Sequence, residues 1–142
     1  MSAFLLLTVL AAQSVEPVDL LSLDAAIERC ERATVLPVFA AEAQRRSAAV
    51  TGFYQEQAQI VAERFATAGK RRALREATAA SVPAMPDASL PTDQELSLRQ
   101  LALDDRQRAL DDQRRLETMR QEAVDLKRQY FLTRCAANKK PG

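Results

Sequence analysis

The apolar positions of the chain fall into two long stretches of helical periodicity, separated by a proline-rich interruption. Residues 36–80 place apolar side chains every three or four positions among Ala, Glu, Gln and Arg. Residues 81–91 contain three prolines, which a helix interior does not tolerate, so this segment is predicted to be a loop. In the second stretch, residues 93–136, Thr92 and Glu95 precede the apolar pattern at the spacing of a capping box. The pattern predicts two long helices joined by a loop.

A third and shorter helix is predicted over residues 22–33. Its apolar side chains recur at the spacing of one helix face: Leu23, Ala26, Ile27 and Cys30. Ser22 or Asp24 is expected to cap this helix. Thr34 is expected to cap the long helix that follows, with Pro37 in its first turn, where a missing N–H costs nothing.

The two long helices are similar in length, about 65 Å each at 1.5 Å per residue. Equal helices around a short loop favour an antiparallel hairpin. The predicted fold is therefore all-α, an elongated coiled-coil-like hairpin forming a single domain over residues 15–142, with residues 137–142 as a frayed tail. Pairing of these helices between two chains, through the proline-rich linker, remains an alternative. The hairpin predicts five pairs of facing positions, listed from its open end: Phe39 with the Tyr130–Phe131 end, Val50 with Ala123, Phe53 with Met119, Ile60 or Val61 with Leu110, and Leu74 with Leu98.

A duplicated heptad in the second long helix supports a packing seam. Residues 103–109 and 110–116 share the Leu-Asp-Asp beginning, and Leu96, Leu103 and Leu110 occupy one helix face. An adjoining seam with steps of three and four residues is expected from five further positions: Leu116, Met119, Ala123, Leu126 and Tyr130.

The first residues of the chain indicate export. The apolar run from Phe4 to Ala12 spans about 13 Å as a helix, too short to cross a bilayer but suited to a secretory signal. Residues 1–14 are predicted to be a signal peptide cleaved near Ser14, placing the mature chain in the periplasm or outside the cell. The first basic side chain is Arg29. A start codon further upstream, or a cytosolic chain with an apolar N-terminus, therefore remains open.

The cysteines and the charge balance bear on structure and partners. Cys30 and Cys135 are the only two cysteines, and an even pair in an exported chain suggests a disulfide that closes the open end of the hairpin. The 20 basic and 19 acidic residues leave a net charge of +1. Such a balance provides no general attraction to nucleic acid or to anionic lipid.

The absence of histidine argues against enzymatic activity. Without histidine the chain cannot form a Ser-His-Asp or Cys-His nucleophile, an ordinary zinc site or the Glu-x-x-His pair of a di-iron bundle. Its three glycines have no phosphate-loop spacing. We therefore expect no enzymatic activity, no cofactor and no small-molecule substrate.

Two charged groups are candidates for chemistry. The aspartate pairs Asp104-Asp105 and Asp111-Asp112 could hold a divalent cation, but arginines three or four residues further on favour a solvated ion-pair face. The one dense basic cluster could contact an anion or a partner, although a solvated surface is the plainer interpretation. That cluster consists of Lys70, Arg71, Arg72 and Arg75.

These features together predict an exported, non-enzymatic helical protein that acts as a protein-interaction or structural module of the bacterial periplasm or envelope. Its partner is expected to be another protein or a second copy of the chain. A holdase-like periplasmic chaperone and a protein associated with the envelope or a lipid surface are the alternatives. The architecture alone does not separate the three.

Overall fold

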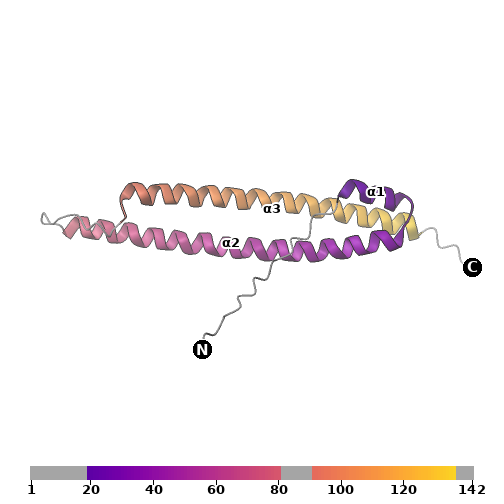
Figure 1. Ribbon diagram of the computed structural model, residues 1–142, viewed down its shortest axis with the longest axis horizontal. Coiled ribbons are helices and arrows are strands. Elements are labelled where there is room, and N and C mark those ends of the chain that lie inside the picture. Colours follow the sequence, from indigo (N-terminus) through magenta and orange to yellow (C-terminus); the bar gives the residue numbers. More distant parts are fainter. Residues whose placement is uncertain (1–18, 81–90, 137–142) are drawn as a thin grey trace, which may run out of the picture.

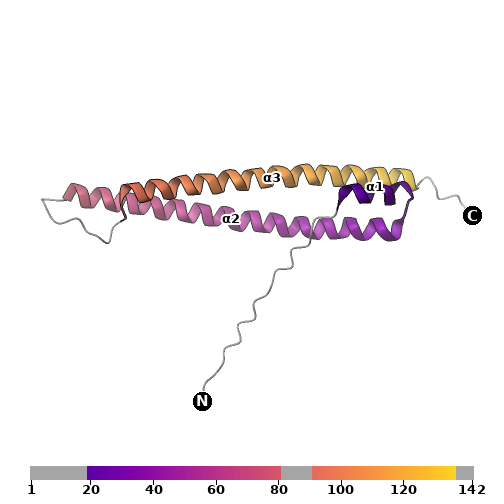
Figure 2. The same ribbon diagram turned by 45° about the horizontal axis from the view of Figure 1, so that its top comes forward.

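The chain folds into a long helical hairpin with a short helix at its open end (Figure 1). The computed structural model describes residues 19–80 and 91–136. They form α1 (Leu20–Glu28), α2 (Arg32–Ala80) and α3 (Asp93–Ala136). Figures 1 and 2 show α2 and α3 side by side along their length, with α1 against the C-terminal end of α3. The predicted all-α hairpin is confirmed, while the predicted signal peptide, most of the loop and the tail lie outside the described residues.

The short helix begins and ends earlier than its predicted range of 22–33. The carboxylate of Asp19 accepts a hydrogen bond from the Leu21 N–H at 3.0 Å, so Asp19 caps α1 in place of Ser22 or Asp24. At the other end Cys30 adopts a positive φ of 53°. A left-handed residue after the last turn is a common way to end a helix, and here it turns the chain toward α2.

The first long helix begins at Arg32, not near residue 36. The Glu31 carbonyl accepts the N–H groups of both Thr34 and Val35, so the first turn is already formed where Thr34 was expected to act as the cap. Pro37 consequently lies inside the helix, beyond its first turn. It leaves one carbonyl of the preceding turn, that of Ala33, without an intrahelical partner.

The second long helix begins and ends as predicted. Its capping box is complete: the Thr92 N–H donates to the Glu95 carboxylate at 2.8 Å, and the Glu95 N–H donates to the Thr92 hydroxyl at 3.2 Å. Asp93 and Glu95 also place negative charge in the first turn and Arg134 places positive charge in the last, both favourable with the helix dipole.

The apolar core is concentrated at the open end of the hairpin. There α1 covers α2 and α3, and six residues form one buried cluster: Leu23, Ala26, Ile27, Val35, Phe131 and Cys135. Phe39 packs edge-on against Phe131, with ring centroids 6.2 Å apart. This contact confirms the predicted approach of Phe39 to the Tyr130–Phe131 end.

Along the rest of the hairpin α3 contributes one buried residue every seventh position. Those positions are Leu96, Leu103, Leu110, Val124 and Phe131, with Glu117 in the same register. Ile60 on α2 is buried as well. Leu110 lines a hollow with Ala49, Phe53 and Glu56 of α2, and its predicted pairing with Ile60 or Val61 stays a prediction. The three leucines are therefore confirmed as the seam.

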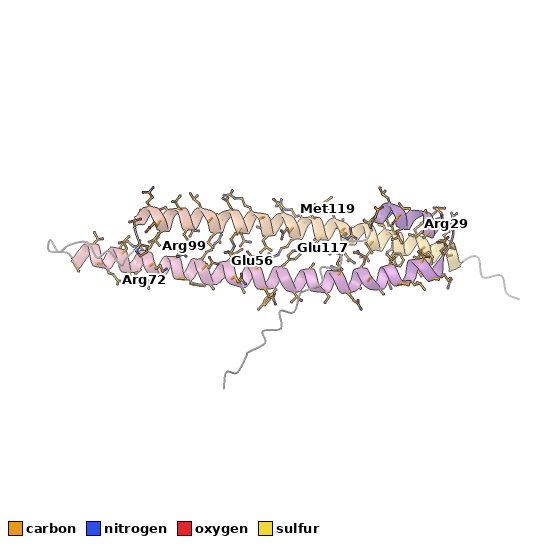
Figure 3. All side chains as sticks on the ribbon, viewed as in Figure 1. Arg29, Glu56, Arg72, Arg99, Glu117 and Met119 are labelled. Carbon is orange, nitrogen blue, oxygen red and sulfur yellow. A yellow bond between two sulfur atoms is a disulfide. The ribbon has the colours of Figure 1, made fainter. Side chains whose placement is uncertain are left out.

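The expected adjoining seam is wrong. Leu116, Met119, Leu126 and Tyr130 are exposed, Met119 by 65%, and Met119 points away from α2 (Figure 3). The physical reason is rotation: Leu116 follows Leu110 by six residues, which turns it about 120° off the seam, whereas a step of seven stays within about 20°. Phe53 accordingly lies beside Arg114 and Thr118 instead of Met119.

Candidate interaction surface

The open end of the hairpin is clasped by a disulfide and by polar contacts around it. Cys30 and Cys135 are bonded, as predicted, with Sγ atoms 2.06 Å apart. Tyr130 donates from its hydroxyl to the Glu28 carboxylate at 2.9 Å, and Arg134 forms an ion pair with the same carboxylate at 2.8 Å. Both cysteines are consumed by this bond. The pair therefore joins α3 to the turn after α1 and offers no thiol for catalysis.

One turn beyond the core, four charged side chains join α2 to α3. Arg45 makes a bidentate contact with Glu117 at 2.9 and 2.7 Å, and Arg120 makes one with Glu42 at 3.0 and 2.6 Å. Arg45 also donates to Glu42 at 3.0 Å, so the two pairs form one network. Two parallel N–H to oxygen bonds are the strongest geometry for such pairs.

Glu42 is the most deeply buried member of this network, with only 5% of its side chain exposed. Burial opposes ionisation of its carboxyl, but hydrogen bonds from Arg120 and Arg45 outweigh burial and hold the pKa of Glu42 below its ordinary value. Hydrogen bonding by Glu117 raises the pKa of the Arg45 guanidinium. The network therefore keeps the Glu42 carboxylate ionised and fixes the alignment of the two helices at this point.

The middle of the hairpin carries a second set of polar contacts between the helices. Arg106 lies between two carboxylates of α2, Glu56 at 2.9 Å and Glu63 at 2.7 Å. Arg64 contacts Asp104 at 2.9 Å. These groups are partly exposed, and such pairs add little to stability. The main effect of these pairs is on orientation, because they turn the charged side chains of central α2 toward α3.

The aspartate pairs of α3 act as ion-pair partners. Asp105, Asp111 and Asp112 each contact the arginine three residues further along α3, at 2.9, 3.7 and 3.6 Å. Asp104 pairs with Arg64 of α2 instead of the expected Arg108. Within the described ranges, no group of three or more acidic or cysteine side chains is arranged to hold a metal ion.

The basic cluster of α2 does not form one surface. Arg71 is half-buried and donates to the Ser97 hydroxyl at 3.3 Å across the hairpin. Lys70 and Arg72 are exposed, but two residues of helix separate their directions by about 160°. Figure 3 shows Arg72 on the side of α2 away from α3. The four predicted contact residues thus cannot meet one anion together, although Arg72 and Arg75 share a side.

The outer face of α2 differs from the rest of the surface. Between Ser47 and Gly69, all of which the structure describes, the charged residues are Glu56, Glu63 and Arg64, and all three are engaged by α3. The solvent side of this segment therefore carries no charge. Four larger apolar side chains within an arc of about 60° remain exposed there: Val50, Tyr54, Val61 and Phe65. We call this surface, Ser47 to Gly69 on the solvent side, the α2 face.

The α2 face was not singled out from the sequence. Tyr54 and Phe65 are each 75% exposed, and depletion of charge with exposed aromatic rings is typical of the centre of a protein interface. The signal in the sequence is one helix face without charge, at positions 47, 50, 54, 58, 61, 65 and 68. It could be recognised only once the direction of the three charged residues was known.

A second apolar stripe runs along the outside of α3, on the side opposite the seam. Its larger residues are exposed and are separated by charged positions such as Asp112 and Arg115. They are Leu98, Leu101, Leu116, Met119, Leu126 and Tyr130. Charged residues interrupt this stripe, whereas none interrupts the α2 face.

The hairpin has two open hollows near its middle, one on each side of Phe53. The hollow of about 410 Å³ is continuous with the α2 face and is lined by Val50, Tyr54 and Arg46 of α2 and by Arg114 of α3. The hollow of about 450 Å³ on the other side exists because Ala49, Gly52 and Ala109 fill little space. Both are open surface depressions, whereas a small-molecule site usually encloses most of its ligand.

None of the helices among the described residues is long and apolar enough to span a bilayer. Comparison of the chain with protein-family models, with curated proteins and with solved structures found no match in any of the three.

Proposed function

We propose that the chain is an exported, non-enzymatic helical module that binds a protein partner through the α2 face. The single observation that carries this proposal is the uncharged strip from Ser47 to Gly69, with Tyr54 and Phe65 exposed at its centre. An exposed apolar strip bordered by polar residues is typical of an interaction site. The rigid hairpin, closed by the disulfide at one end, supports the proposal because it holds the strip straight before a partner binds.

The distribution of charge supports a protein partner over a lipid surface. Binding of a helix to an anionic membrane requires basic residues beside the apolar face along its length. Beside the middle of the α2 face, Arg64 and Arg114 are paired with Asp104 and Asp111. The other basic residues beside it lie at its ends, Arg46 at one and Arg72 and Arg75 at the other. The basic cluster at residues 70–75 also argues against a lipid surface, because its side chains point in different directions.

Site-specific photo-crosslinking in cells that express the full chain tests the proposal. A photoreactive residue replaces Ala62, within the α2 face, and a matched variant carries it at Ala102, an exposed alanine of α3. The expected result is a discrete crosslinked product from position 62 and none from position 102. Equal products from both positions, or none from position 62, would contradict the proposal.

Two further measurements distinguish the alternatives. A holdase-like chaperone would suppress aggregation of an unfolded client at equal molar ratio, and would crosslink to many proteins instead of one. A lipid-associated protein would co-sediment with anionic vesicles and would lose that binding when Lys70, Arg71, Arg72 and Arg75 are replaced. We expect neither result. Cell fractionation with mass analysis of the N-terminus tests the proposed export and cleavage near Ser14.

A further inference from the structure

The large side chains of the α2 face are spaced symmetrically. Val50, Tyr54, Val61 and Phe65 follow one another at intervals of four, seven and four residues. This series of intervals is the same from either end of the helix. A second α2 face placed antiparallel on the first therefore aligns all four positions at once, Val50 with Phe65 and Tyr54 with Val61.

We propose that the occupant of the α2 face is a second copy of this chain, docked antiparallel, with a two-fold axis that passes between Gln57 and Ala58. Each aromatic ring then lies opposite a valine of the other copy, so large and smaller side chains alternate along the contact. In a parallel arrangement Tyr54 would meet Tyr54 and Phe65 would meet Phe65, while the valines would face each other across a gap. The antiparallel arrangement is also isologous, which closes the assembly at two chains.

The charges favour the α2 face of the second copy, and not its α3 stripe, as the surface that docks. An uncharged strip cannot compensate a charged side chain that is buried against it, and burial of an unpaired charge is costly. The outer stripe of α3 would bring Asp112 and Arg115 into such a contact. A second α2 face brings none between Ser47 and Gly69, because its three charged residues are already engaged by its own α3.

The size of the contact predicts a weak dimer. The face is about 33 Å long at 1.5 Å per residue, and a strip of roughly 12 Å width gives on the order of 400 Å² on each copy. The two copies together then bury about 800 Å², below the roughly 1,200–2,000 Å² of stable specific interfaces and within the range of weak, transient ones. Small residues of the face, such as Ala58 and Ala62, let the two helices approach closely. We expect a dissociation constant on the order of micromolar and therefore a concentration-dependent equilibrium.

Sedimentation equilibrium of the purified protein between about 5 and 500 μM tests the dimer. We expect a shift from monomer to dimer across this range, and Phe65→Glu to raise the dissociation constant at least tenfold, because it places a charge in the contact. Leu116→Glu, at an exposed leucine of the α3 stripe, is the matched control and is expected to change the dissociation constant less than twofold. A chain that stays monomeric throughout, or a dimer that tolerates Phe65→Glu, would overturn the inference.

Engineered cysteines test the direction. In the antiparallel arrangement Ala58→Cys lies next to its own counterpart, whereas the two copies of Ser47→Cys lie about 30 Å apart. Disulfide formation needs Cα atoms within about 7 Å. We therefore expect covalent dimers from Ala58→Cys and none from Ser47→Cys. Equal crosslinking of both variants indicates a parallel pair and would overturn the proposed alignment.

This inference rests on the proposed function, and the two can fail separately. A monomeric protein that still gives a discrete heterologous crosslink from position 62 would overturn the second copy as occupant and leave the interaction module intact. A monomer without any crosslink from position 62 would remove both.

Discussion

The open end and the middle of this hairpin are held together by different forces. At the open end, α1, α2 and α3 bury a continuous apolar cluster around Phe131 and are joined by the disulfide. In the middle, single buried residues such as Ile60 and Leu110 alternate with ion pairs and amides that bridge the two helices. The open end gains its stability from apolar burial and chain closure, and the middle gains mainly alignment from polar contacts. A long two-helix rod can therefore be anchored at one end and still keep a defined register further along.

This difference also explains why the middle offers the interaction surface. Two helices alone cannot cover all their apolar residues, and α1 covers only the open end. The charges that align the middle are all turned inward, toward α3. The solvent side of α2 between Ser47 and Gly69 is left uncharged as a direct consequence.

The largest effect is expected from removing the aromatic ring at the centre of the open-end cluster. Phe131→Ala deletes a side chain that is 2% exposed and leaves a cavity, which costs about 3–5 kcal/mol of unfolding free energy. Leu132→Ala, at the neighbouring but half-exposed position, is the control and is expected to cost less than about 1 kcal/mol. Chemical denaturation followed by circular dichroism gives both values. Similar losses for the two variants would contradict the concentration of the core at this end.

The disulfide is expected to rank next. Replacing Cys30 and Cys135 together by alanine removes a link between positions 105 residues apart, at a cost of about 2–5 kcal/mol, because the unfolded chain regains freedom. The loss is expected to be smaller when the protein is already destabilised at the same end. A double-mutant cycle with Phe131→Ala measures this coupling. An unfolding free energy unchanged by the cysteine replacement would show that apolar packing alone closes the open end.

Breaking the four-residue charge network is expected to cost less than either. Glu42→Gln leaves Arg120 without its bidentate partner in a largely buried position, at a cost of about 1–3 kcal/mol. Glu122→Gln, an exposed glutamate of α3, is the matched control with an expected change below about 0.5 kcal/mol. Thermal denaturation of the two variants at pH 7 compares them, and equal midpoints would argue that the network contributes nothing.

The pH dependence sharpens the assignment to Glu42. Because the pKa of Glu42 is lower in the folded protein than in the unfolded chain, its contribution is fully present above the unfolded pKa. It is lost as the pH falls through the folded pKa, since protonation breaks the contacts with Arg120 and Arg45. Stability is therefore expected to fall in acid more steeply for the natural chain than for Glu42→Gln. Parallel acid titrations of the two proteins would refute the role of this carboxyl.

The smallest effect is expected on the outer surface of α3. Asp112→Asn removes an ion pair with Arg115 in which both side chains are at least 70% exposed, and such pairs contribute little. We expect no resolvable change in the denaturation midpoint, at low or high salt. A clear loss of stability would show that the surface pairs of the duplicated heptads do more than keep the helix solvated.

Much of the fold could be predicted from local sequence. The capping box of Thr92 and Glu95 fixed the start of α3, and the seven-residue spacing of Leu96, Leu103 and Leu110 predicted the seam correctly. The pairing of Cys30 with Cys135 followed from a hairpin with equal arms. Each of these features depends on residues close in sequence or on the lengths of the two long helices, and both can be read from the sequence.

The tertiary structure decided what helical periodicity leaves open. The α3 helix carries two apolar stripes, and only the position of α2 determines that Leu110 is buried while Leu116 faces solvent. The α2 face likewise exists because α3 supplies Asp104 and Arg106 to draw Arg64 and Glu63 inward. A period of 3.6 residues defines the faces of a helix, but the burial of a face is a property of two surfaces in contact. The sequence by itself therefore determined the helices and their link, and only their packing determined which surface is free to bind.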